Sequence, residues 1–126
     1  MTDSRTKVHT ALDHGDQGGI AVDFGGTPVT GIHVLAVEKL REHFGLDRRP
    51  VRVIEPYQML GEIEDDLRNA MGIDTIGLSP RNNMFGIPNE GPWKEMRTFW
   101  GQVVLVPAQF NTSMDDAGNL LIHPEG

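Results

Sequence analysis

Residues 22–33 read VDFGGTPVTGIH, and this stretch decides how the fold of the chain is interpreted. The apolar character of residues 20–24 predicts a short strand, and Gly25 with Gly26 permits a turn with positive φ. Thr30 is suited to cap a helix that begins at residues 31–32. A helix N-terminus after a tight turn presents backbone N–H groups that could receive an anion. A Gly-Gly turn also serves as a plain connection, so a purely structural role stays open.

Composition limits the classes of protein to consider. The chain has 126 residues, 38% of them hydrophobic, which is enough for one domain with a modest core. A net charge of −7 without a Lys/Arg run argues against nucleic-acid or anionic-membrane partners. The absence of cysteine excludes disulfides, thiolate nucleophiles and Cys-containing zinc sites within the chain. Without a membrane-length apolar run or a signal peptide, we expect a cytoplasmic protein.

Three helices are predicted from apolar periodicity. Residues 3–13 form a short helix capped by Asp3 or Ser4, and residues 31–44 form a second helix that Gly45 ends. A third helix is expected from about residue 56 to residue 71, with Gly72 as its stop. Its acidic face is interpreted as a solvated surface rather than a metal site; it consists of Glu62, Glu64, Asp65 and Asp66.

Apolar and β-branched runs predict the strands. They lie at residues 20–24, 51–54, 73–78 and 103–106, and residues 110–112 and 120–122 are expected to form a β-hairpin near the C-terminus. The segment 73–78 is interpreted as buried on both faces. A helix that leads directly into such a strand is half of an α/β unit, so the fold class is α/β.

The loop of residues 81–96 follows the predicted strand 73–78. In an α/β fold the segment after a strand lies at the ligand-binding face, which makes Arg81, Asn82 and Asn83 candidates for a pocket. His33 is the only histidine next to the glycine turn, and no two histidines stand at a metal-ligand spacing. The alternatives are a solvated loop for residues 81–96 and a capping or packing role for His33.

Several short motifs resemble the N-terminal third of the uroporphyrinogen decarboxylase superfamily. They are residues 4–8 (SRTKV), 11–14 (ALDH), 21–27 (AVDFGGT) and 31–33 (GIH). Residues 57–66 (YQMLGEIEDD) and 71–78 (MGIDTIGL) are similar to the helix that precedes a barrel strand in that superfamily. The resemblance covers nearly the whole chain and is closest to the uncharacterised and methyltransferase-like branches.

The resemblance implies a fold and a cofactor pattern. It implies that residues 1–126 form the N-terminal portion of a (β/α)₈ TIM barrel, because a complete barrel needs about 250 residues. We therefore expect an N-terminal fragment or one subunit of a split barrel. No cofactor is implied for this chain itself, whereas zinc and a corrinoid belong to full-length methyltransferase relatives.

The decarboxylases of porphyrin biosynthesis differ from this sequence at two places. They carry paired arginines in the segment that corresponds to residues 23–33, which has none here, and a gap-free alignment places Arg81 where they have an essential aspartate. Both differences argue against authentic uroporphyrinogen decarboxylation. In the methyltransferases of the superfamily the zinc ligands, a His-x-Cys pair and a later Cys, belong to the C-terminal region, which this chain does not contain.

Two functions remain as expectations. In the first, an enzyme of this superfamily acts on a tetrapyrrole or methylated substrate, and one side of its cleft is lined by Asp23, Gly25, Gly26, Thr27, His33, Arg81 and Asn82. There, Arg81 and the glycine turn would bind an anionic group of the ligand. In the second, the chain is a non-catalytic binding module whose strand edges are covered by a partner or by a second copy in a homodimer.

Overall fold

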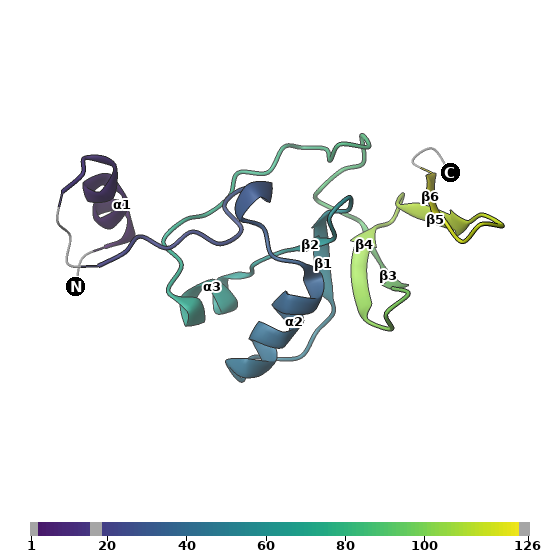
Figure 1. Ribbon diagram of the computed structural model, residues 1–126, viewed down its shortest axis with the longest axis horizontal. Coiled ribbons are helices and arrows are strands. Elements are labelled where there is room, and N and C mark those ends of the chain that lie inside the picture. Colours follow the sequence, from purple (N-terminus) through teal and green to yellow (C-terminus); the bar gives the residue numbers. More distant parts are fainter. Residues whose placement is uncertain (1–2, 16–18, 124–126) are drawn as a thin grey trace.

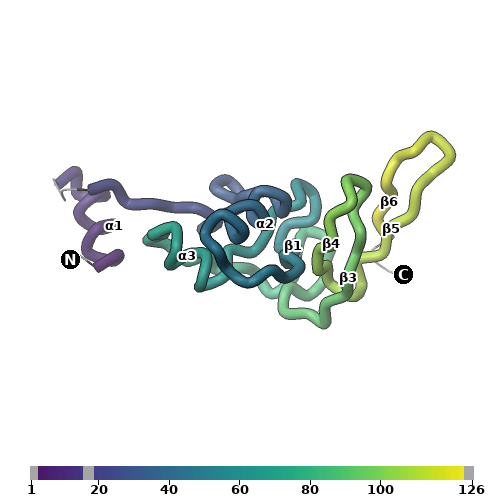
Figure 2. The backbone as a smooth tube through the Cα atoms, turned by 90° about the horizontal axis from the view of Figure 1, so that it is seen from below, coloured from purple at the N-terminus to yellow at the C-terminus, as the bar shows by residue number. Residues whose placement is uncertain are grey.

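The chain forms an elongated α/β structure with a compact middle and two projecting ends (Figures 1 and 2). The computed structural model describes residues 3–15 and 19–123. Helix α1 (Ser4–Leu12) stands at one end, and the hairpin of β5 (Asn111–Met114) and β6 (Leu120–His123) stands at the other. The expected C-terminal hairpin and the cap of α1 at Asp3 are both confirmed.

A four-stranded mixed sheet occupies the middle of the molecule. Its order is β2 (Leu60–Gly61), β1 (Val51–Glu55), β4 (Val103–Pro107) and β3 (Trp93–Arg97). Only β1 and β4 are parallel, and the outer pairs are antiparallel. The α/β class is confirmed, but the sheet of the described residues is open and does not close into a barrel.

Helices α2 (Val34–His43) and α3 (Asp65–Met71) supply the helical side of the core. Their fully buried side chains meet the central strands in one cluster, whose best-buried members are Val34, Val37, Val53, Leu67, Val104 and Val106. Gly45 and Gly72 follow the two helices at φ +66°, a conformation that glycine adopts without steric cost. Both predicted helix stops are therefore confirmed.

The predicted start of the second helix is wrong. Residues Pro28–Thr30 form a separate 3₁₀ turn, so Thr30 belongs to that turn and does not cap the helix. His33 is the N-cap of α2, because its Nδ1 accepts a hydrogen bond from the Leu35 N–H at 3.2 Å. Histidine is not a usual capping residue, so this boundary has only a weak signal in the sequence.

The predicted third helix is too long. Residues 56–59 form a turn, and β2 follows before α3 begins at Asp65. The Glu55 carboxylate fixes this turn by accepting the N–H groups of Tyr57 (3.1 Å) and Gln58 (2.7 Å). Met59 then takes φ +55°, which ends any helical path.

The acidic residues of the predicted third helix are not only a solvated surface. Glu64 and Asp66 bind Arg41, whose side chain is 3% exposed, and they also bind Arg49. Both Nε and an η nitrogen of Arg41 donate to the Asp47 carbonyl. The buried guanidinium is therefore fully paired, and this network ties α2 to α3.

The two segments expected as the first and third strands are extended but form no ladder. Residues 20–24 and 73–78 share one backbone hydrogen bond, from the Asp74 N–H to the Val22 carbonyl at 2.8 Å. Val22 lies beside Asp74, and Gly26 lies beside Gly77, so the segments run in the same direction. The prediction that residues 73–78 are buried on both faces is wrong, since Ile76 is 70% and Leu78 97% exposed.

Candidate functional site

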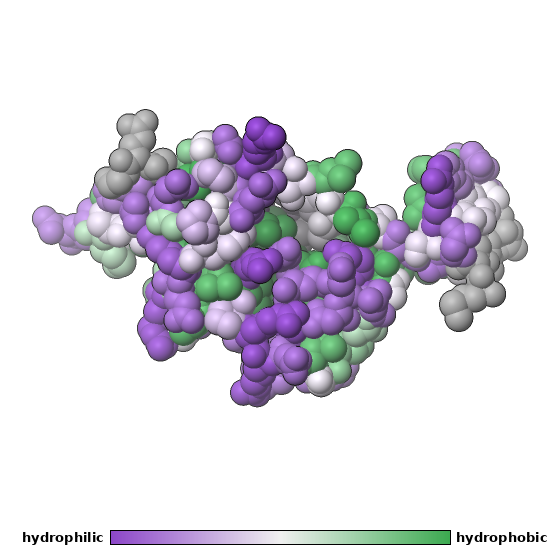
Figure 3. Space-filling model, turned by 180° about the vertical axis from the view of Figure 1, so that it is seen from behind, coloured by the Kyte–Doolittle hydropathy of each residue, from purple (hydrophilic) through white to green (hydrophobic). Residues whose placement is uncertain are grey.

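A groove of about 410 Å³ opens beside the glycine turn. Three segments form its walls: residues 25–31, the β1–β2 connection at residues 54–60, and the loop that begins at Gly77. The apolar wall consists of Pro28, Ile54, Pro56, Leu60, Leu78 and Met84. In the space-filling view, hydrophobic surface (green) likewise reaches the outside of the middle of the molecule between polar regions (Figure 3).

The structure brings together only part of the predicted site. Gly25, Gly26 and Thr27 line the groove. The Asp23 carboxylate lies just outside, where it accepts the Gly26 N–H at 3.1 Å and the Thr75 hydroxyl at 2.5 Å. Asp23 therefore holds the shape of the groove wall without lining it.

Arg81 and Asn82 are exposed and lie at the rim. Their neighbours Pro80 and Asn83 line the groove, but Arg81 and Asn82 themselves do not. The Arg81 carbonyl accepts the Asn89 N–H at 3.0 Å, which fixes the backbone of the rim. Within residues 3–15 and 19–123, the guanidinium of Arg81 makes no ion pair.

His33 does not line the groove, although it forms an isolated β-bridge with Leu60 of the groove wall. Besides capping α2, its ring packs on Trp100 with 5.2 Å between ring centroids. These contacts correspond to the capping and packing role that the sequence left open for it.

The N–H groups of the glycine turn are already used inside the turn. Gly25 donates to the Thr30 carbonyl at 2.8 Å, and Thr27 donates to the Thr30 hydroxyl at 3.3 Å. The Gly26 N–H is held by Asp23. An anion beside this turn would have to displace these acceptors, so Arg81 is the stronger anion-binding group of the two.

The glycines of the groove wall permit close packing. A Cβ at Gly77 would stand 2.8 Å from the Gly26 carbonyl oxygen, and a Cβ at Gly31 would stand 2.4 Å from Leu60 Cδ1. Gly25 takes φ +78°. Side chains at these positions would push the wall segments apart.

The groove surface has little charge. Glu55 is the one lining residue with a full charge, and its carboxylate is occupied by the turn at residues 57–58. The uncharged polar side chains of the groove are amides and hydroxyls, from Gln58, Asn83, Asn89, Thr27, Tyr57 and Ser79. This surface suits a flat, mainly apolar ligand whose charged groups extend to the rim.

The sequence missed Tyr57, Leu78 and Met84 as lining residues. The sequence predicts a helix at Tyr57 and a buried strand at Leu78, yet the two side chains are 75% and 97% exposed. The Glu55-Pro56 pair was a usable signal, because a carboxylate just before a proline often organises a turn.

A larger groove of about 580 Å³ lies between α2 and the start of β4. Its cations are in ion pairs: Lys39 and Arg48 with Glu42, and Arg49 with Glu64 and Asp66. We therefore favour the smaller groove as the candidate site. Within residues 3–15 and 19–123, no three His, Asp or Glu side chains are arranged to hold a metal ion.

Compared with models of protein families, with curated proteins and with solved structures, the chain matches none of them. None of the helices in the described part of the chain is long and apolar enough to cross a membrane.

Proposed function

We propose that the chain is the N-terminal part of a uroporphyrinogen decarboxylase-like enzyme of the methyltransferase-like branch, and that the groove is one wall of its substrate cleft. The proposed ligand is a tetrapyrrole or a methylated small molecule with an apolar body. The observation that carries the proposal is the mainly apolar groove with Arg81 free at its rim. A tetrapyrrole has flat apolar faces and peripheral carboxylates, so its body fits the wall and a carboxylate reaches Arg81.

The arrangement of the two extended segments supports the barrel part of this proposal. Residues 22–26 and 74–77 run side by side in the same direction, and a helix precedes the second of them. Neighbouring extended segments that run in the same direction, with a helix before the second, are also found in β/α barrels.

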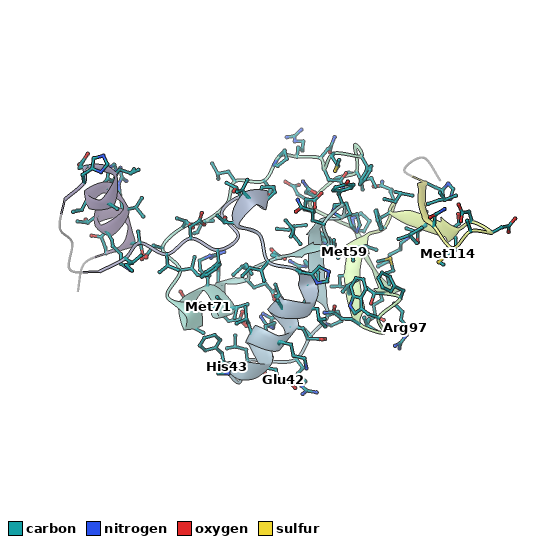
Figure 4. All side chains as sticks on the ribbon, viewed as in Figure 1. Glu42, His43, Met59, Met71, Arg97 and Met114 are labelled. Carbon is teal, nitrogen blue, oxygen red and sulfur yellow. The ribbon has the colours of Figure 1, made fainter. Side chains whose placement is uncertain are left out.

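Porphyrin binding to the purified chain tests the proposal. Uroporphyrin and cobalamin are titrated separately, and binding is followed by the change in their visible absorption. Met84→Glu places a charge on the apolar wall and is expected to weaken binding at least tenfold. Met114→Glu is the matched control, because Met84 and Met114 are 67% and 65% exposed and Met114 lies on the distant hairpin (Figure 4).

The role of Arg81 is tested in the same titration. Arg81→Ala is expected to weaken binding of uroporphyrin, which carries carboxylates, and to change the binding of an esterified, uncharged porphyrin much less. Equal affinity of Arg81→Ala and wild type for uroporphyrin would contradict the anion-binding role. No binding of either uroporphyrin or cobalamin to the wild type would contradict the proposed substrate class and favour a non-catalytic interaction module.

A further inference from the structure

The groove contains one aromatic side chain among its described lining residues. This residue is Tyr57, and it is 75% exposed although it is large and mostly apolar. An aromatic ring offers a flat face that packs on the face or edge of another ring. The other lining side chains, such as Pro28 and Leu78, offer apolar contact without such a face.

The turn that carries Tyr57 is held at both ends. The Glu55 carboxylate accepts the N–H groups of Tyr57 at 3.1 Å and Gln58 at 2.7 Å. At the other end, the Met59 carbonyl accepts the Val34 N–H at 2.9 Å, and the Met59 side chain packs against the core. Met59 takes φ +55°, a left-handed conformation that is unfavourable for a residue with a side chain and persists where its surroundings fix it. The turn therefore holds the backbone of Tyr57 beside the groove.

Tetrapyrroles differ in whether an aromatic side chain can lie on them. A metal-free porphyrin is planar and conjugated, and both of its faces are open. Cobalamin carries axial ligands on both faces of a puckered corrin ring. Offset stacking of two rings needs an open face, because the ring centroids come within about 4.5–7 Å of each other.

We propose that Tyr57 determines the ligand specificity of the groove by stacking on an open, conjugated face of the ligand. Glu55 is a positioning residue, because its carboxylate fixes the turn that presents the ring. The inference rests on the proposed function, since it takes the groove as the ligand site. It narrows the ligand class to a planar, porphyrin-like ring in preference to a corrinoid.

NMR of the tyrosine ring tests the stacking directly. Tyr57 is the single tyrosine of the chain, so selective labelling gives one set of ring signals. The protein is titrated with metal-free uroporphyrin, and binding is followed in the same samples by visible absorption. Stacking places the ring protons over a porphyrin face, where the ring current of the macrocycle moves their signals upfield. We expect an upfield shift that saturates together with the absorption change, and no such shift with cobalamin.

Two substitutions separate the aromatic face from the hydroxyl. Tyr57→Phe keeps the face and is expected to bind uroporphyrin within about twofold of the wild type. Tyr57→Ala removes the face and is expected to weaken binding about tenfold or more. Because Tyr57 is 75% exposed, neither change disturbs the core.

Glu55→Ala tests the positioning role. This change releases the two N–H groups that fix the turn, so the upfield shift of Tyr57 at saturating uroporphyrin is expected to shrink. A shift measured at saturation reports the position of the ring and does not depend on affinity. Glu95→Ala is the matched control, because it removes the same side chain from β3, at the opposite edge of the sheet from β2, and it is expected to leave the shift unchanged.

The outcomes separate this inference from the proposed function. Uroporphyrin binding without an upfield shift, or with equal affinity in Tyr57→Ala, would overturn the inference and leave the proposed function standing. Binding of cobalamin in place of uroporphyrin would do the same. Absence of binding by both tetrapyrroles would overturn the proposed function and the inference with it. An undiminished shift in Glu55→Ala would contradict the positioning role of Glu55.

Discussion

Two pairs of neighbouring extended segments run in parallel in this molecule, and only one of them forms a ladder. Strands β1 and β4 pair through Val51 with Val104 and Arg52 with Leu105, and each has a further strand on its outer side. Residues 22–26 and 74–77 share one backbone hydrogen bond, and among the described residues no further strand pairs with either segment. Both pairs are rich in apolar residues, so composition does not explain why only one pair forms a ladder. The explanation is that β1 and β4 are buried and flanked by further strands.

The comparison is tested most strongly by one leucine of the core that packs on β1 and β4 and one leucine of the exposed segment 73–78. Leu67 is fully buried and Leu78 is 97% exposed. Leu67→Ala is expected to lower the free energy of unfolding by about 2–5 kcal/mol, and Leu78→Ala by less than about 0.5 kcal/mol. Urea denaturation followed by circular dichroism measures both. A large effect of Leu78→Ala would mean that the extended pair belongs to the cooperative core.

The second prediction tests how much the ion pairs of Arg41 contribute to the stability of the core. Arg41→Met removes a buried guanidinium, and we expect it to lower the free energy of unfolding by about 3 kcal/mol. This value is at the low end for a broken buried ion pair, because Arg49 still neutralises the carboxylates of Glu64 and Asp66. Arg48→Met is the control, since Arg48 is 82% exposed and solvent screens its pair with Glu42, so that the pair contributes little to stability. Equal midpoints for the two variants in urea would contradict the structural role of Arg41.

A smaller effect is expected where the extended segments touch. Gly77→Ala places a methyl group 2.8 Å from a backbone oxygen, which forces the segments apart at a cost of about 1–3 kcal/mol. Gly19→Ala is the control, because its Cβ position has no neighbour within 4 Å. Amide exchange is expected to rise at residues 22–26 and 74 in Gly77→Ala while the β1–β4 amides keep their protection. Loss of protection across the whole sheet would show that the two regions are one unit.

The smallest effect is expected from lowering the pH, which protonates the Asp74 carboxylate. Hydrogen bonds from Lys7 first, and then from the Val22 N–H, lower the pKa of Asp74 from 3.8 to about 2. Because the folded pKa lies below the unfolded one, this stabilisation is present above pH 4 and is lost as the pH falls toward 2. Amide NMR signals of Val22 and α1 are expected to shift over that range. Asp74→Asn at pH 6 should reproduce the same shifts, and an unchanged Val22 signal in that variant would contradict the assignment.

The sequence predicted the local parts of the fold well. Gly45 and Gly72 marked real helix ends, Asp3 marked a real cap, and the C-terminal hairpin was found because each depends on neighbouring residues. The predictions failed where contacts with residues distant in the sequence decide the local structure. Leu60 and Gly61 fit a helical period but pair with β1, and residues 73–78 read as a buried strand but lack the neighbours that would bury them.

The candidate site was predicted in part for the same reason. The glycine turn was found from its sequence, since positive φ and close packing both require glycine. The opposite wall at Tyr57 could not be found, because its position depends on how the Glu55 carboxylate folds the following turn. His33 was selected for its place beside the turn, but its ring packs on Trp100, which is distant in sequence.

Helix α1 buries none of its side chains, and the Asp74 carboxylate holds it by accepting from Ser4 and Lys7. This makes the helix a convenient reporter. The chain has no cysteine, so Leu12→Cys would create a single labelling site on a side chain that is 71% exposed. A spin label or fluorophore at that position would tumble slowly while Ser4 and Lys7 bind the Asp74 carboxylate and rapidly if those contacts were broken, so one spectrum would follow the N-terminal helix.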